Sequence, residues 1–219
     1  MAMTLPRLTA DTLRTGIFEM TGIAIEMLGQ TREAFLQYSP SAAGRVAVLG
    51  RELHLREKRL TDHVAMQLRE MPWSLGLSEH LAFIPAAMER VGDSIELLIR
   101  CIEGIHRDGV PFSEKATTEI LTLFGREAAM LQEVSAALQA RDRGAIPRIQ
   151  AAGTALQALC DEAALHHQGR VIQGVCTPRA SSIFLAMLDD FREIERYIRR
   201  MTVDIEKALP PADASQAVA

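Results

Sequence analysis

The chain has 219 residues, of which 48% are hydrophobic and only 5% aromatic, and it carries a net charge of −4. This length and hydrophobic content allow one large or two small packed domains, while the mild negative charge excludes a general basic surface for nucleic acid. The three cysteines, Cys101, Cys160 and Cys176, form no C-x-x-C pair, which argues against a disulfide framework and a zinc ribbon and favours a reducing cytoplasmic setting.

Six helix-like stretches follow one another along the chain. Leu, Ala, Met, Glu and Arg are plentiful, which favours helices over strands. The stretches are separated by segments rich in Gly, Pro and Ser at residues 38–44, 71–78, 108–114, 140–147 and 174–179. Ser113 and Thr177 are predicted N-caps of the helices that follow them. No window of about 18 uncharged apolar residues is present, so we predict no direct membrane insertion.

The third predicted helix shows the clearest periodicity. Its apolar positions alternate in steps of three and four, at Leu81, Ile84, Met88, Val91, Ile95, Leu98, Ile102 and Ile105. This spacing is typical of a helix in a bundle. Pro85 lies inside the pattern and predicts either a bend or a late helix start.

The sixth predicted helix repeats this seam. An offset of 103 residues places Leu81 on Phe184 and Met88 on Phe191. We therefore predict an all-α fold of six helices, built as two repeated antiparallel three-helix bundles over residues 1–108 and 109–208. Residues 209–219, with two prolines and small polar residues, are predicted to be a disordered tail.

The stretch MERVGDSIE at residues 88–96 places three carboxylates, Glu89, Asp93 and Glu96, on one helix face away from the seam. Like charges at this spacing cost about 0.2–0.5 kcal/mol per pair in an isolated helix. A divalent cation could remove this repulsion, because it binds hard oxygen donors. A solvated face relieved by Arg90 or Arg100 is the other interpretation, and both stay open.

The order of motifs resembles the PhoU family of phosphate-uptake regulators, which includes domains that follow some sodium–phosphate cotransporters. MERVGD at 88–93 resembles the family's L-E-R-I-G-D helix, and HHQGRVIQGVCTPRASSIFLAMLDDFREIERY is similar to its H-x-x-R-L-x-x-G stretch, Ser/Pro turn and last helix. The resemblance spans residues 15 to 205.

The resemblance implies two three-helix bundles whose E/D-x-x-x-D motifs hold metal ions, commonly iron, zinc, manganese or magnesium. Glu89 and Asp93 match the motif, and Glu57 and Asp62 are the nearest partner acids on the neighbouring helix. A strict overlay could instead place Thr61 at the family's aspartate position. The implied metal set is therefore Glu89, Asp93, Glu57 and Asp62.

The function that the resemblance implies is that of a non-enzymatic cytoplasmic regulator of phosphate transport and phosphate signalling. Its expected partners are a membrane phosphate transporter or the associated sensor kinase, and the expected assembly is a homodimer that binds no nucleic acid. A metal-dependent helical-bundle enzyme and a metal-free structural or interaction bundle are the alternatives.

The second repeat departs from the family pattern. Under the offset of 103, the positions of Glu89, Asp93 and Glu96 are taken by Arg192, Arg196 and Arg199. Guanidinium groups cannot coordinate a cation, so we predict that a second metal cluster is missing. The arginines could bind an anion or a partner, but local pairing with acids of the same helix is favoured: Asp189, Glu193 and Glu195.

Overall fold

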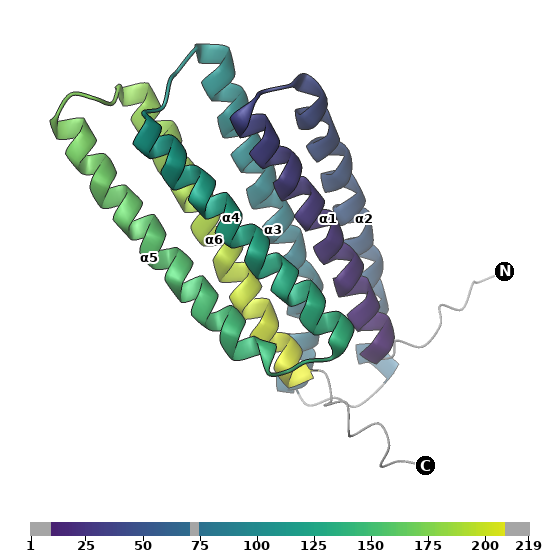
Figure 1. Ribbon diagram of the computed structural model, residues 1–219. Helices are drawn as coiled ribbons and strands as arrows, with labels where there is room; N and C mark the ends of the chain where they lie inside the picture. Colours follow the sequence, from purple (N-terminus) through teal and green to yellow (C-terminus); the bar gives the residue numbers. More distant parts are fainter. Residues whose placement is uncertain (1–9, 71–74, 209–219) are drawn as a thin grey trace.

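The computed structural model describes residues 10–70 and 75–208, and this part of the chain folds into six α-helices without a strand (Figure 1). The helices are α1 (Ala10–Leu36), α2 (Pro40–Glu70), α3 (Leu75–Asp108), α4 (Glu114–Ala140), α5 (Ala145–Ile172) and α6 (Pro178–Ala208). The prediction of an all-α, six-helix fold is confirmed. The predicted tail at 209–219 lies outside the described residues.

Local chemistry sets several helix ends. The Ser113 hydroxyl accepts the Ala116 N–H at 3.2 Å, and the Thr177 hydroxyl accepts the Ala180 N–H at 3.1 Å, so both predicted N-caps are confirmed. Pro85 does not interrupt the helix: α3 is helical from Leu75 to Asp108. The late start considered from the sequence is therefore wrong: other packing contacts of α3 outweigh the hydrogen bond that proline cannot donate.

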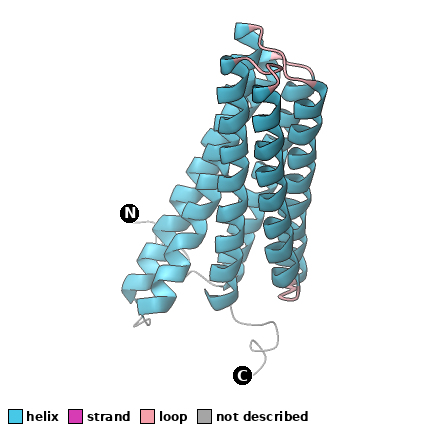
Figure 2. Ribbon diagram, turned by 90° about the vertical axis from the view of Figure 1, so that its left-hand side faces the viewer, coloured by secondary structure: helices cyan, strands magenta, loops and turns pink. Residues whose placement is uncertain are grey.

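Successive helices run antiparallel, and the two halves, α1–α3 and α4–α6, lie side by side along their length (Figures 1 and 2). The halves meet mainly where α3 packs on α6 and where α1 packs on α4, while α2 and α5 lie on the outer sides. No helix in the described part of the chain has the length and apolar character needed to cross a membrane.

The core runs through both halves as one hydrophobic cluster. The central seam positions of α3 and α6 are fully buried: Met88, Val91, Ile95, Phe191, Ile194 and Ile198. Phe124 of α4 contacts Phe191 edge to face at 5.0 Å between ring centroids, and it also contacts Phe35 of α1 at 6.0 Å. Aromatic packing thus joins the two repeats, and the outer faces of α2 and α3 stay free for polar side chains.

Candidate metal centre

Two glycines let α2 and α3 approach closely beneath the acidic face. A Cβ atom at Gly50 would overlap the Glu96 carboxylate, and one at Gly92 would overlap the Leu53 side chain. Neither glycine could therefore become alanine without movement of its neighbour. The close approach brings the outward-facing side chains of the two helices within reach of one another.

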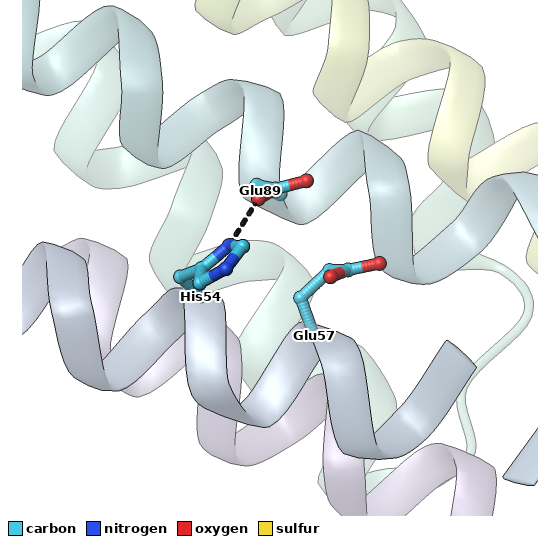
Figure 3. Close-up of side chains that lie close together, drawn as sticks. All are labelled: His54, Glu57 and Glu89. Carbon is cyan, nitrogen blue, oxygen red and sulfur yellow. Dashed lines mark hydrogen bonds and ion pairs between the residues drawn. The ribbon is translucent and has the colours of Figure 1, made fainter. Parts of the chain in front are cut away.

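Three side chains converge where α2 and α3 meet: His54 and Glu57 from α2, and Glu89 from α3 (Figure 3). The His54 Nδ1 atom lies 2.5 Å from the Glu89 Oε1 atom. One donor atom from each of the three residues lies within 4.8 Å of the others. Thr61 also donates its hydroxyl proton to Glu57 Oε1 at 2.6 Å, which orients that carboxylate.

The cluster lies at the edge of an open groove rather than in the core. The His54 side chain is 61% exposed and the Glu89 side chain 28% exposed. The groove is lined by residues of both helices: Gly50, Arg51, Leu53, His54, Leu55, Glu89, Gly92, Asp93 and Glu96. One imidazole nitrogen and two carboxylates suit a divalent zinc, iron or manganese ion and leave coordination positions for water. The residues present therefore fit a metal ion.

Two of the four acids predicted as metal ligands lie in the cluster, and two lie outside it. Glu57 and Glu89 belong to the cluster. Asp93 lies one turn along α3, lines the same groove and pairs with Arg90 at 3.3 Å. Asp62 is exposed and does not belong to the cluster.

Sequence reasoning missed His54. His54 lies three residues before Glu57, so both side chains lie on one helix face. This spacing could have identified His54 from the sequence. The partner across the helix interface could not be identified in the same way, because periodicity does not specify how far α2 is shifted along α3.

The second half holds arginines where the first half has this acidic face. Each arginine is paired with an acid of its own helix: Arg192 with Asp189 at 2.8 Å, Arg196 with Glu193, and Arg199 with Glu195 at 3.6 Å. Arg192 also reaches Asp161 on α5 at 3.0 Å. The local pairs favoured from the sequence are thus present, and the charge of this face is largely balanced.

Comparison with solved structures identifies the architecture. The crystal structure of PhoU from Pseudomonas aeruginosa superposes with a TM-score of 0.77 at 14% identity, covering 88% of this chain and 93% of that one. The phosphate transport system regulatory protein PhoU from Streptococcus pneumoniae gives the same TM-score at 10% identity, covering 96% and 97%. The chain has the PhoU fold.

No protein-family model matches the sequence, and no curated protein matches it significantly. The PhoU fold is therefore carried here by a sequence that has diverged strongly from both solved structures.

Proposed function

We propose that the protein is a non-enzymatic regulator of the transport of phosphate or a related anion. The observation that carries this proposal is the PhoU fold, which extends over nearly the whole length of both similar structures, one of them described as a phosphate transport system regulatory protein. The protein acts in the cytoplasm as a homodimer, on a membrane phosphate transporter or its associated sensor kinase.

The first half carries the metal site in this proposal. His54, Glu57 and Glu89 bind a divalent or transition metal ion, which is iron, zinc, manganese or magnesium. Because the ligands come from both α2 and α3, the bound cation fixes the two helices relative to each other and neutralises the carboxylates in the groove. The groove thereby presents a defined surface to the partner.

The regulatory role is tested in the source organism. The gene is deleted, and uptake of labelled phosphate and a phosphate-starvation reporter are measured at high external phosphate. Loss of a restraining regulator should raise both, and the wild-type gene should restore them. Unchanged uptake and reporter levels after deletion would contradict the proposed function.

The metal site is tested separately on purified protein. Elemental analysis after chelator-free purification should find about one ion per chain in the wild type and little in His54→Ala/Glu89→Ala. Asp62→Ala is the matched control, because it also removes an acid of α2 but lies outside the cluster. A wild type that takes up no iron, zinc, manganese or magnesium would refute the site and leave the regulatory role to the genetic test.

A further inference from the structure

Two glutamates are buried inside the second half: Glu127 of α4 and Glu195 of α6. Glu127 is fully buried, and neither of its carboxylate oxygens has a hydrogen-bond partner. Glu195 is 4% exposed, and its buried Oε2 atom also lacks a partner, while its Oε1 atom lies 3.6 Å from Arg199. Because buried polar atoms are almost always paired, unpaired oxygens on both carboxyl groups in one core require a physical explanation.

The first half shows that helix packing does not require this pair. The offset of 103 places Ala24 at the position of Glu127 and Gly92 at the position of Glu195. Ala24 and Gly92 are both buried, so the first half fills these two interior positions with two of the smallest residues. The carboxyl groups are thus an addition peculiar to the second half.

In the described part of the chain, neither carboxylate oxygen of Glu127 has a hydrogen-bond partner, although the charge of Arg192 of α6 acts on the neighbouring Cys160 thiol. Helices α1, α5 and α6 pack against α4. From α6 comes Glu195, whose carboxylate interacts with Arg196 and Arg199, and from α5 comes the thiol of Cys160, which is buried and has a pKa raised to about 12. The buried hydroxyls of α1 are those of Thr21 and Thr31, and both donate to carbonyl groups of their own helix.

We propose that Glu127 and Glu195 form a proton-binding site in the core of the second half, at which Glu127 holds a proton at neutral pH. Burial, and then the nearby charge of Glu195, raise the pKa of Glu127 well above its usual value. In the described part of the chain, the only group of three or more metal-binding side chains is the one at His54. Two carboxyl groups alone would leave a divalent cation poorly coordinated, and a proton needs no further ligand.

The bound proton makes stability depend on pH in a defined direction. The pKa of Glu127 is raised in the folded state above its ordinary value of 4.5. Its contribution to stability is therefore complete below about pH 4.5 and is lost as the pH rises through the folded-state pKa. Within that window the equilibrium constant for unfolding rises up to about ten-fold per pH unit for each proton involved.

Other groups with raised pKa values limit the useful window. Burial is the main cause that raises the pKa of Asp190 to about 7. Protonation of Asp190 therefore also stabilises the folded state at low pH, but this contribution is lost as the pH rises through about 7. Burial also raises the pKa of the Cys101 thiol to about 11, so the folded protein keeps it protonated where the unfolded chain begins to ionise it. Burial likewise raises the pKa of the Cys160 thiol to about 12 and is the main cause that raises the pKa of Glu195. Because these groups are all present in a Glu127 variant as well, the difference in pH dependence between the wild type and that variant reports on Glu127.

Denaturant unfolding from about pH 7 to 9 tests the proposal. The equilibrium constant for unfolding of the wild type should rise by up to about ten-fold per pH unit for the Glu127 proton, and Glu127→Gln, which cannot ionise, should show a smaller rise than the wild type. Glu162→Gln is the matched control, because Glu162 is an exposed glutamate of α5, and it should retain the wild-type slope. An unchanged slope in Glu127→Gln would overturn the proposal.

Infrared spectroscopy supplies a test that does not depend on a stable variant. At about pH 8, above the pKa of Asp190 of about 7, the wild-type protein should still show the C=O stretch of a protonated carboxyl group. Glu162→Gln should keep this band, and a folded Glu127→Gln should lose it. Absence of the band from the wild type would overturn the proposal, as would a bound metal ion that disappears in Glu127→Gln.

Discussion

The two halves of the molecule share one packing plan but place their charges differently. In the first half the cluster of His54, Glu57 and Glu89 lies on the outer face. The buried residues there that correspond to Glu127 and Glu195 are Ala24 and Gly92, which carry no charge. In the second half the outer acidic face is replaced by paired arginines, and the inner positions are Glu127 and Glu195. The comparison shows that a helical repeat can keep its core spacing while its ionisable groups move between surface and interior.

A second exchange lies nearer the α5–α6 turn. Arg170 of α5 is buried and binds both carboxylate oxygens of Glu119 of α4, at 3.2 and 2.8 Å. The equivalent positions in the first half are Gln67 and Gly16. The second half thus joins α4 to α5 through a buried ion pair. The two equivalent residues of the first half are uncharged.

The largest effect is expected when an inner carboxyl group is transferred to the first half. Ala24→Glu would place a carboxyl group at a fully buried position of α1. Overpacking and an unpaired buried polar group together should lower the free energy of unfolding by about 3–5 kcal/mol, measured by denaturant titration. Thr15→Glu, on the exposed side of α1, should change it by less than about 0.5 kcal/mol. Equal effects of the two variants would show that the interior of the first half accepts a carboxyl group as readily as its surface does.

Removal of the buried cation in the second half should have the next largest effect. Among the described residues, Arg170→Ala leaves Glu119, whose side chain is 14% exposed, with His166 at 3.0 Å as its remaining ion-pair partner. Breaking such a pair should lower the free energy of unfolding by about 3 kcal/mol. Arg179→Ala removes an arginine from an exposed pair with Asp108 and should cost no more than about 1 kcal/mol. A cost for Arg170→Ala within the range of Arg179→Ala would show that burial does not strengthen this pair.

The reverse transfer should stabilise the second half. Glu127→Leu replaces an unpaired buried carboxyl group with an apolar side chain of similar length, as the Ala24 position of the first half is apolar. We expect a gain of about 1–3 kcal/mol at about pH 8. The gain should be smaller at about pH 5, because the wild-type carboxyl group gains its stabilising protonation as the pH falls toward its ordinary pKa. A gain that grows on acidification would contradict a raised pKa for Glu127.

The helix seams and the repeat of the two halves could be predicted from the sequence. The steps of three and four in the third and sixth helices, together with the offset of 103, predict the bundle seams and the repeat, because burial forces apolar residues onto one helix face. The same periodicity places Glu127 among Phe124, Met130 and Leu131, yet an isolated glutamate in a helix is far more often exposed than buried. The contact of His54 with Glu89 required the relative shift of two helices, which side-chain packing and not periodicity determines.

The smallest effect on stability is expected at the arginine face. Arg192 and Arg196 form ion pairs on the surface, so Arg192→Ala and Arg196→Ala should each change the free energy of unfolding by less than about 0.5 kcal/mol. Arg45→Ala, which removes an exposed pair with Glu26 in the first half, is the matched control. A loss above about 1 kcal/mol in either variant, but not in the control, would mean that the arginines hold the second half together. If stability is unchanged while phosphate uptake in the complemented strain is altered, the same arginines contact an anion or a partner, and their pairing with neighbouring acids is then the resting arrangement of a functional surface.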